Sequence, residues 1–397
     1  MLPPMTQTRG ARFEVAVVGG GAAGLAAALT AAIAGFRTVL FAPPTHFPPG
    51  RTAALLHGSI KILSELDVWP ALAGHAAPLT AIRLVDATKR LVRAPEVTFY
   101  ASEIGLPAFG YNIPNGDLAD GLRRYAEAFE GLTLVATPVE AITPEEDRVD
   151  LRTSDGAYSA RLVIAADGAR SLAREAAGIR VRRWTYAQSA LVATLAVRHP
   201  HQGVSTEFHT ENGPFTLVPM PGDRVSLVWV DRPEVVEAAL AMPEDTFSAE
   251  VEQRARSIHG AMRLDSRPAI FPLGAALADS FAARRTMLVG EAAHLFPPIG
   301  AQGLNLGFRD VAALRKVLTR HRNDPGSPAA LATYHQARHA DVRSRTLAVD
   351  LLNRSLLTDF LPVQAARGLG LSLAASVPAL RHFLMRQGIA GRGRASA

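Results

Sequence analysis

Residues 14–24 of this 397-residue chain have the sequence EVAVVGGGAAG, and the expected fold follows from it. Residues 14–18 have the composition of a short apolar strand, and a helix is expected from the glycines to about Ala34. Gly19, Gly21 and Gly24 follow the G-x-G-x-x-G pattern. There the first glycine permits a tight turn, the second lets backbone N–H groups approach a pyrophosphate, and the third lets helix and strand pack closely. The pattern predicts dinucleotide binding at the helix N-terminus.

The residues after this helix complete a βαβ unit but lack one expected side chain. A second strand is expected at residues 36–41. The dinucleotide pattern places an Asp or Glu at the end of that strand to hold ribose hydroxyls, and Ala42 stands there instead. The adenosine ribose is therefore expected to be held in another way or more weakly. The alternative interpretation is an Ala- and Gly-rich turn that binds no ligand.

Composition excludes several classes of function. The chain has no cysteine, which rules out disulfides, thiolate metal sites, a cysteine nucleophile and CxxC redox chemistry. A redox function would therefore need a bound cofactor. The net charge of +6 arises entirely from residues 338–397, which contain nine arginines and three acidic residues. No basic stripe interleaved with aromatic residues points to nucleic-acid binding.

Targeting signals and other catalytic motifs are missing from the sequence. The N-terminus lacks the layout of a signal peptide, and the Gly- and Ala-rich segment 15–36 suits a strand, turn and helix better than a membrane span. A cytoplasmic location is therefore expected. GxSxG and Walker lysine motifs are absent. His335 and His339 have neither a third ligand nor an HExxH motif, so we expect no metal site and place both at the surface.

The rest of the chain indicates a sheet domain and a helical tail. The expected elements before residue 170 are an amphipathic helix and three strands, at residues 116–130, 132–142, 148–153 and 158–166. Residues 185–230 contain longer alternating strands, which suit an antiparallel sheet with one face against a ligand or core. In this sheet Phe215, Met220 and Trp229 are candidate substrate contacts, each equally well explained as core. The later expected elements are a buried strand and a helix, at residues 286–290 and 303–320.

Two further motifs carry a resemblance to a known family. Residues 162–171, LVIAADGARS, and 288–310, LVGEAAHLFPPIGAQGLNLGFRD, together with the N-terminal glycines resemble the three flavin motifs of class A flavoprotein monooxygenases. Within that class the chain is similar to the ubiquinone-biosynthesis hydroxylase family. The segments that narrow the resemblance are RTAAL, YNIPN, VSLVWV and LLNRSLL, at residues 51–55, 111–115, 225–230 and 351–357.

The resemblance implies a fold and an activity. The fold is α/β and para-hydroxybenzoate hydroxylase-like, with a Rossmann-like FAD-binding domain interrupted by an antiparallel sheet that holds the substrate. The expected FAD-binding parts are 1–75, 101–182 and 274–340, the sheet domain 76–100 and 183–273, and the helical tail 341–397. The implied reaction uses FAD, NAD(P)H and oxygen to hydroxylate the ring of a polyprenylated phenol through a flavin C4a-hydroperoxide.

The resemblance also assigns cofactor contacts to individual residues. Asp167 supports flavin and pyridine-nucleotide contacts, with a β-turn as the alternative, and Arg51 approaches the FAD phosphates, with a surface arginine as the alternative. Glu291 stands where the family has Asp on the ribityl chain. The residues assigned to FAD binding are Gly19, Gly21, Ala22, Ala23, Gly24, Arg51, Val139, Asp167, Gly168, Gly290, Glu291, Pro298, Gln302, Gly303, Leu304 and Asn305. Gly307 and Asp310 complete the last motif.

No side chain of this chain is expected to be catalytic, because the chemistry belongs to the flavin. The loop with Pro297, Pro298 and Gly300 is expected to shape the site and exclude water. The helix from Gly303 would direct its positive end at the N1/C2=O edge of the flavin. A purely structural loop is the alternative. The chain departs from the family pattern at Pro297, where the family has His, at Ala301, where it has Gly, and near Asn115, where many relatives have Arg.

The tail and the overall function leave alternatives open. Residues 351–386 mix apolar residues with arginines, at 354, 367, 381 and 386. This pattern suits an anionic membrane surface and equally a helix packed on the flavin domain. A ubiquinone-biosynthesis complex is a further possible partner. The alternative functions are a flavin hydroxylase of a soluble phenol and a non-catalytic scaffold subunit, the latter suggested by Ala42, Glu291 and Ala301.

Overall fold

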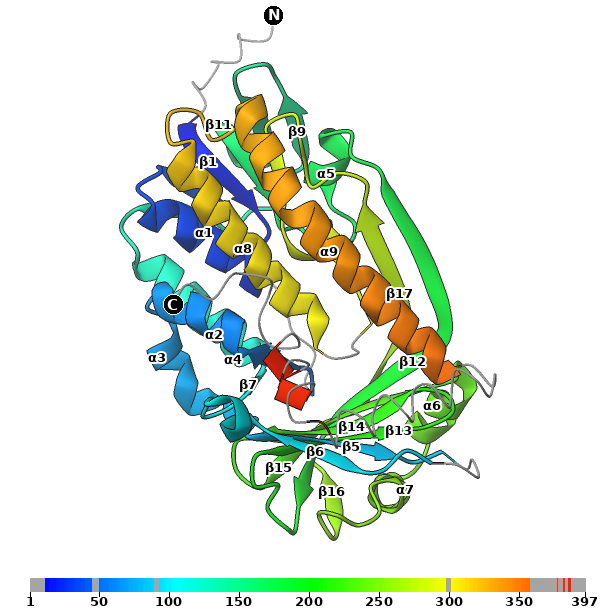
Figure 1. The fold of residues 1–397 in the computed structure, drawn as a ribbon. Helices are drawn as coiled ribbons and strands as arrows, with labels where there is room; N and C mark the ends of the chain where they lie inside the picture. The colour runs from blue at the N-terminus through cyan, green and yellow to red at the C-terminus, as the bar shows by residue number, and fades with distance from the viewer. Residues whose placement is uncertain are drawn as a thin grey trace, which may run out of the picture.

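The structure is a computed structural model that describes residues 11–44, 50–88, 93–297, 301–357, 377, 381–382 and 385–386 (Figure 1). Its core element is a parallel sheet in the order β19-β11-β1-β2-β8. These five strands span Thr286–Leu288, Gly156–Ala165, Ala11–Val18, Thr38–Phe41 and Leu132–Val135. Antiparallel strands extend the sheet, namely β18 (Ala282–Ala283) beside β19, β10 (Val149–Thr153) beside β11, and β9 (Ala141–Pro144) beside β10. The predicted βαβ opening is confirmed.

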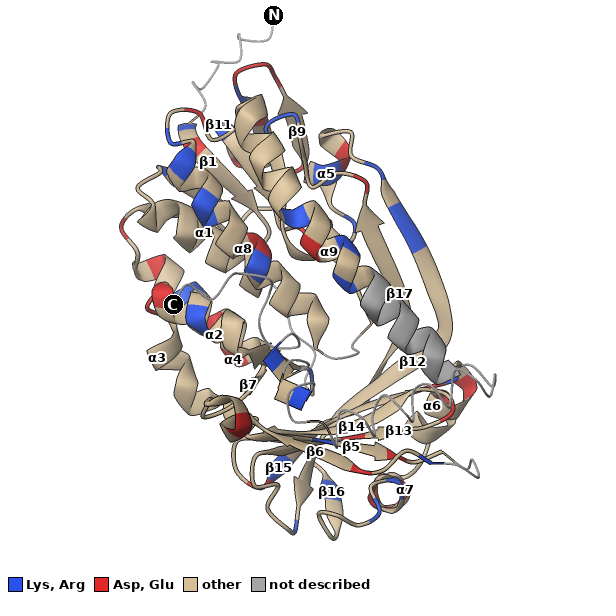
Figure 2. Ribbon diagram, in the orientation of Figure 1, with Lys and Arg blue, Asp and Glu red and all other residues tan. Residues whose placement is uncertain are grey.

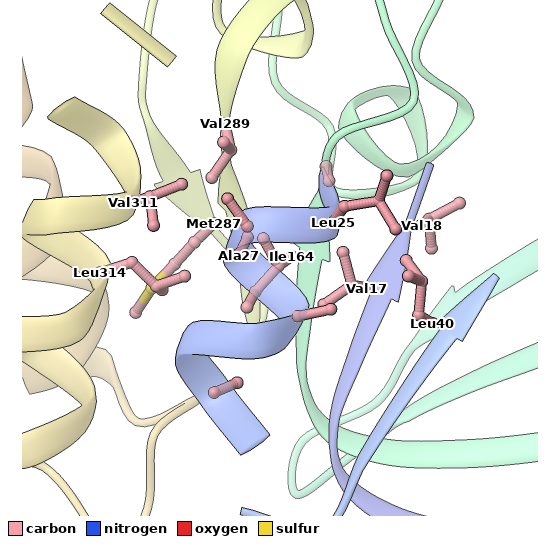
Figure 3. Close-up of a cluster of buried hydrophobic side chains, with 14 of the residues drawn as sticks. Val17, Val18, Leu25, Ala27, Leu40, Ile164, Met287, Val289, Val311 and Leu314 are labelled. Carbon is pink, nitrogen blue, oxygen red and sulfur yellow. The ribbon is translucent and has the colours of Figure 1, made fainter. Parts of the chain in front are cut away.

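Helices cover this sheet and complete the main core. The four helices that matter for the site are α1 (Ala22–Ile33), α4 (Asn115–Ala128), α8 (Gln302–Arg320) and α9 (Pro328–Leu357). Figure 3 shows α1, which carries Leu25, between the strand that carries Val17 and the helix α8 that carries Val311. All three side chains are at most 1% exposed. Because α1 is rich in alanine and glycine, it can approach both the sheet and α8 closely.

A small three-stranded sheet connects the first sheet to the second. It has the order β3-β7-β4 and spans Thr52–Leu56, Gly110–Pro114 and Ala77–Pro78. Three short helices lie between β3 and β4, namely α2 (His57–Glu65), α3 (Trp69–Leu72) and η1 (Ala73–His75), and η2 (Ala101–Ile104) precedes β7.

The second sheet is largely antiparallel and has one face covered by helices. Its order is β20-β17-β12-β15-β14-β13-β5-β6, with β16 beside β12. In that order the strands span His294–Leu295, Ala269–Ala278, Val181–Val197, Arg224–Asp231, Pro214–Met220, Val204–His209, Ala81–Asp86 and Val97–Tyr100, and β16 spans Met262–Leu264. Helices α6 (Pro233–Leu240) and α7 (Glu244–Arg254) pack on one face. Phe215 and Trp229 lie in that covered core, which favours the core interpretation of both side chains.

Several boundaries differ from those expected. The expected strand 132–142 is divided into β8 and β9, because Pro138 lies between them and cannot donate a backbone hydrogen bond. The expected domain boundary after residue 273 falls inside β17, and the one after 340 falls inside the continuous helix α9. The division into domains stays a prediction. Among the residues that the structure describes, no helix is long and apolar enough to span a membrane.

Candidate functional site

Three sequence motifs meet at the carboxyl edge of the parallel sheet. The strands β1, β11 and β19 end in register, with Val18 beside Ala165 and Ala165 beside Leu288. The Ala166 N–H donates to the Val18 carbonyl at 2.8 Å, and the Val289 N–H donates to the Ala165 carbonyl at 2.8 Å. The glycine turn, the Asp-Gly turn and the Gly-Glu turn therefore start side by side. In doubly wound sheets, ligands bind outside this edge.

The three glycines after β1 have different structural roles. Gly19 has φ +119°, and a Cβ there would lie 2.1 Å from the Ala166 carbonyl oxygen. A Cβ on Gly24 would lie 2.0 Å from the Gly19 oxygen, so both outer glycines are required by the fold. At Gly21, however, a Cβ would meet no atom within 4 Å. Gly21 therefore faces open space at the carboxyl edge, where a ligand can approach the backbone.

The start of α1 offers unpaired backbone donors to that space. Gly21 is the N-cap and gives no side-chain cap, and the first turn contains no acidic residue. The N–H groups of the first turn of a helix have no carbonyl partner within it. The helix dipole adds partial positive charge at the same point. Such an arrangement suits an anion such as a pyrophosphate, and its donors here are the N–H groups of Ala22, Ala23 and Gly24.

The Asp-Gly turn is held by its own capping contacts. The Asp167 carboxylate accepts hydrogen bonds from the Ser171 hydroxyl and, at 3.1 Å, from the Ala173 N–H, which caps helix α5 (Leu172–Ala176). Gly168 has φ +81°, a left-handed conformation that favours glycine. The Asp167 side chain is thus engaged with the protein and fixes the shape of the turn.

A buried arginine that the sequence did not reveal joins two of the motifs. Arg174 is 1% exposed and donates to the carbonyls of Ala169 and Ala292, both at 3.1 Å. Burial lowers the pKa of this guanidinium, and the nearby charge of Arg183 adds to the effect. Arg174 therefore clamps the Asp-Gly turn to the Gly-Glu turn. In the sequence it has the appearance of an ordinary surface arginine in a short helix.

The Gly-Glu turn packs closely against α1 and α8. Gly290 has φ +62° and opens the 3-10 turn η3 (Gly290–Ala292), with Glu291 exposed beside it. A Cβ on Gly307 of α8 would lie 3.3 Å from the Ala23 Cβ and 3.5 Å from the Gly290 Cα. Small residues at these positions therefore bring the turn and the two helix starts together. The Glu291 carboxylate is left facing solvent at this edge.

The side chain of Asn305 has a structural role. Its Oδ1 accepts from the Leu56 N–H at 2.8 Å and from the Ser59 hydroxyl at 2.6 Å. Its Nδ2 donates to the carbonyls of Ala54 at 2.8 Å and Ala301 at 2.6 Å. The side chain thus uses both polar atoms within the protein and joins β3 and α2 to the start of α8. The prediction that Asn305 contacts the cofactor stays a prediction, and in this structure its side-chain amide is engaged within the protein.

The start of α8 has an unusual cap. Ala301 is the N-cap in the left-handed conformation, with φ 53° and ψ 35°, where the family pattern has glycine. The first turn has no side-chain cap and no acidic residue. The N–H groups of Gly303 and Leu304 are therefore available to a ligand, and a Cβ on Gly303 would meet no atom within 4 Å. Pro297 is buried, while Pro298 and Gly300 lie outside the described residues.

The second sheet turns its uncovered face toward β3. The Thr52 hydroxyl of β3 donates to the Ser226 hydroxyl of β15 at 3.0 Å. The guanidinium of Arg51, an exposed residue, lies 4.8 Å from the centre of the Phe271 ring in β17. Asn112 of β7 donates to the Pro219 carbonyl at 2.9 Å. Arg51 was expected near phosphates, and in this structure its contact is with the sheet.

A half-exposed row of side chains crosses this uncovered face. Val192 pairs with Val228, and Val228 pairs with Thr216, on three adjacent strands. All three are half-buried, whereas Leu191, Trp229 and Phe215 one position away are buried on the face covered by α6 and α7. Successive side chains of a strand point to opposite faces. The row is therefore an accessible surface of two valines and a threonine.

The remaining predicted cofactor contacts have mixed surroundings. Ala42 is fully buried, and its carbonyl accepts two hydrogen bonds of 3.2 Å from the Arg123 guanidinium of α4. Val139 is half-buried between β8 and β9 and packs on the main core. Arg123, which the sequence motifs do not single out, reaches the position where the pattern predicts a ribose-binding acid. Asn115 lies at the first residue of α4, where its N–H donates to the Arg51 carbonyl at 3.0 Å.

The histidine pair is structural. His335 accepts a hydrogen bond from the Phe281 N–H at its Nδ1, at 3.2 Å, and its ring lies 5.1 Å from that of His339. Burial lowers the pKa of His335, and His339 lowers it further. Both side chains are half-buried and pack against Phe281, so they lie at the surface of the protein with one side covered. Among the described residues no group of three metal-ligating side chains exists.

The described part of the tail packs on the second sheet. Arg381 donates to both carboxylate oxygens of Glu103, at 2.5 and 2.7 Å, and lies 4.6 Å from the centre of the Phe99 ring. The hydrogen bond from Arg381 lowers the pKa of Glu103. Met385 is 7% exposed in a cluster with Ala101. The packing partner is therefore β6 and η2 of the second sheet, and the side chains of Arg354 and Arg367 lie outside the described residues.

Known proteins are similar to this chain over almost its whole length. Residues 12–347 match a family described as FAD binding domain. The chain is 33% identical over 394 residues to the ubiquinone hydroxylase UbiL of Rhodospirillum rubrum, covering 96% of this chain and 91% of that protein. It is 31% identical to the 3-demethoxyubiquinol 3-hydroxylase of Escherichia coli, covering 94% of this chain and 97% of that protein.

Solved structures share the fold. The p-nitrophenol 4-monooxygenase PnpA of Pseudomonas putida superposes with a TM-score of 0.78 at 19% identity, covering 96% of this chain and 100% of that one. HpxO of Klebsiella pneumoniae, solved in complex with FAD and uric acid, superposes with a TM-score of 0.76 at 18% identity, covering 95% and 96%. The mixed architecture of a Rossmann-like sheet with an inserted antiparallel sheet is therefore confirmed.

Proposed function

Because this chain belongs to the FAD binding domain family, and within it to the flavin hydroxylases of ubiquinone biosynthesis, we propose that it hydroxylates the aromatic ring of a polyprenylated phenol. One oxygen atom of O2 enters a ring C–H bond, the other leaves as water, and NAD(P)H provides the two electrons. When bound, FAD supplies the chemistry that links electron uptake to oxygen transfer. The chain itself binds, orients and excludes water.

The observation that supports this proposal best is the cradle at the carboxyl edge of the first sheet. Gly21 and Gly303 leave space where a Cβ would otherwise stand, at the starts of α1 and α8. Neither helix start carries an acidic residue or a side-chain cap. The α1 start suits the FAD pyrophosphate, and the α8 start suits the edge of the flavin that becomes negative on reduction. The residues present therefore fit the cofactor.

The uncovered face of the second sheet supports an apolar substrate. Val192 and Val228 are half-exposed on the face that is turned toward β3, so they can contact a prenyl chain or an aromatic ring. The relatives named above act on ubiquinone precursors, according to their names. We infer that this row forms part of the substrate cavity. Phe215 and Trp229, on the opposite face, do not contribute.

The proposal is tested with the purified full chain saturated with FAD. NAD(P)H consumption and product mass are measured with a prenylated phenol and with the same phenol without its prenyl group. A product heavier by one oxygen, formed faster from the prenylated compound, supports the proposal. Equal rates on both favour the soluble-phenol alternative, and a chain that stays colourless at saturating FAD favours the scaffold alternative.

A variant pair tests the substrate row separately from the cofactor. Val228→Phe narrows the space above the row, so we expect a raised KM for the prenylated phenol with unchanged affinity for FAD. Phe215→Leu is the matched control, because that side chain is buried under α6 and α7. It should lower thermal stability and leave KM unchanged. Equal KM effects in both variants would contradict the assignment of the row.

The finer partner proposal concerns a membrane surface at residues 351–397. Its support is the excess of arginine in this segment, since each basic residue near an anionic surface contributes about 1 kcal/mol. Arg381 is already paired with Glu103, so exposed Arg386 and the arginines after it would carry the contact. Replacement of Arg386, Arg392 and Arg394 by Gln should weaken sedimentation with anionic vesicles. Arg180→Gln, at a position 91% exposed on the first part of the second sheet, is the control; equal sedimentation of both would exclude docking.

A further inference from the structure

The Gly-Glu turn is held from behind by a fully buried carboxylate on α8. Asp310 is 0% exposed, and its Oδ2 accepts from the Gly290 N–H at 2.9 Å and from His294 Nε2 at 2.8 Å. Its Oδ1 accepts from Arg338 Nε at 2.6 Å. Burial alone would raise the pKa of Asp310, but the charges of His294 and Arg338 and these hydrogen bonds outweigh it, so the pKa is lowered. Asp310 therefore stays ionised.

Each partner of Asp310 comes from a different part of the fold. Gly290 opens the turn that follows β19 of the first sheet. His294 belongs to β20, which pairs with β17 at the edge of the second sheet. Arg338, 4% exposed, comes from α9. The Asp310 carboxylate thus fixes the Gly-Glu turn, the second sheet and helix α9 relative to one another.

Helix α9 also holds the residue just before the turn. The Tyr334 hydroxyl, one helical turn before Arg338, donates to the Leu288 carbonyl at 2.7 Å. Tyr334 is 0% exposed, and burial raises its pKa well above the ordinary value. It therefore remains a donor across the working pH range. Both sides of the Val289–Gly290 step are tied to α9, one directly and one through Asp310.

A second carboxylate extends the connection to the start of α8. Asp341 accepts from Arg338 Nη1 at 2.7 Å and from Arg345 Nε at 3.1 Å. Arg345 in turn donates from Nη1 to the Gln302 Oε1 at 3.2 Å. Figure 2 shows basic and acidic residues on both α8 and α9, two helices that pack against each other. A connected series of ion pairs and hydrogen bonds therefore runs from the Gly-Glu turn to the first residue of α8. These two places flank the flavin cradle.

We propose that Arg338 is a positioning residue of the flavin site, which sets the Gly290–Glu291 turn and the start of α8 relative to the cofactor through Asp310 and Asp341. Nothing about this role is visible from the motif itself, because Arg338 lies well beyond the AQGLNLGFRD stretch at residues 301–310. The inference depends on FAD binding and not on which phenol is hydroxylated. FAD affinity therefore tests it separately from the proposed reaction.

The experiment compares three variants in the full chain. Arg338→Met removes the charge, Arg338→Lys keeps it, and Asp324→Asn is the control. Asp324 also accepts two hydrogen bonds from an arginine, Arg285, at 2.9 and 3.1 Å, in the loop between α8 and α9 away from the cradle. For each we would measure the melting temperature of the apoprotein, the dissociation constant for FAD and the visible circular dichroism of bound flavin.

We expect Arg338→Met to weaken FAD binding about tenfold, the effect of losing one charge-assisted hydrogen bond, and to change the flavin circular dichroism. Arg338→Lys should restore most of both. Asp324→Asn should lower the melting temperature and leave FAD affinity and the flavin signal at wild-type values. Equal loss of FAD affinity in Asp324→Asn and Arg338→Met would overturn the proposal, because a general loss of stability would then explain both.

A milder variant keeps the test decisive if Arg338→Met does not fold. Arg345→Met removes the contact with Gln302 and leaves Asp310 and its partners intact. The Arg345 side chain is 17% exposed and lies at the periphery of the network. We therefore expect the variant to fold. A changed flavin circular dichroism and weaker FAD binding would support the proposal. Wild-type values for both would overturn it.

Discussion

Single residues in this site differ in whether the fold or the ligand requires them. Gly19 and Gly24 have no room for a side chain, because a Cβ would strike a backbone oxygen. Gly21 has room, so its selection reflects what approaches from outside. The sequence pattern predicts all three, because the turn is local. Arg174 and Arg338 escape such prediction, since their burial depends on segments far apart in the chain.

The first prediction at this scale concerns Gly21. Gly21→Asp places a side chain and a negative charge where the pyrophosphate is expected, and no protein atom within 4 Å opposes it. We expect FAD binding to be lost with little change in the melting temperature of the apoprotein. A flavin titration and a thermal melt measure the two effects.

Gly116→Asp is the control for this variant. Gly116 lies in the first turn of α4 and a Cβ there also meets no atom within 4 Å. This variant should bind FAD as the wild type does. Flavin retained in Gly21→Asp would refute the placement of the cofactor.

The second prediction concerns Ala301, whose left-handed conformation disfavours any side chain with a Cβ. That conformation costs about 1–2 kcal/mol for an ordinary residue. Glycine avoids this strain, but it also makes the unfolded chain more flexible, which offsets part of the gain in stability. Ala301→Gly should therefore raise the free energy of unfolding by about 0.5–1 kcal/mol. Ala313→Gly, inside α8, should lower it by about as much. Thermal melts that place Ala301→Gly below the wild type would contradict this explanation.

At the scale of elements, the local sequence pattern predicted whether a segment is a helix or a strand better than it predicted where that element begins and ends. The helix 116–130 and the strand 286–290 are present as α4 and β19 within a few residues. The segment 132–142 divides into two strands because β8 pairs with β2 while β9 pairs with β10. Which neighbour a strand joins is decided by the whole sheet. For the same reason the sequence did not show that α9 continues without a break across residue 340.

The third prediction concerns the joint between β3, α2 and α8. Asn305→Ala removes four hydrogen bonds that connect these elements, so we expect a loss of about 2–4 kcal/mol of stability, since each contributes about 1 kcal/mol. Asn305→Asp keeps the two acceptor contacts and sets a charge against two carbonyl oxygens, so it should also destabilise. Asn323→Ala, at an exposed loop position, is the control. Equal melting temperatures of Asn305→Ala and Asn323→Ala would contradict the assigned role.

At the scale of the whole molecule, a network of buried charges joins the two sheets and makes stability depend on pH. Burial alone would raise the pKa of Asp341, but the hydrogen bond from Arg338 and the charges of Arg309 and Arg345 lower it below the ordinary value of 3.8. The unfolded chain then takes up protons before the folded one does. The stabilisation is complete above the ordinary pKa and is lost as the pH falls through the lowered one.

The fourth prediction follows from that sign. Melting temperatures of the apoprotein should fall steeply as the pH decreases from about 5 to about 3. Asp341→Asn should melt at a lower temperature at pH 5 and show a shallower fall. Parallel curves for the two proteins would show that Asp341 does not contribute to the pH dependence.

The interrupted order of strands in the first sheet has a consequence for how the chain is synthesised. Strand β11 pairs with β1 through Val15 and Leu162, but its other edge pairs with β19, where Val163 meets Thr286. On the ribosome the end of this edge, at residues 163–165, must wait until strands β12 to β17 have emerged, whereas β10 already covers its beginning. Parallel pairing over such a distance is slow, and an open edge can pair with another chain. We therefore expect nascent chains that stop before residue 286 to aggregate or to require a chaperone, and the flavin site to form only after β19 has joined the sheet.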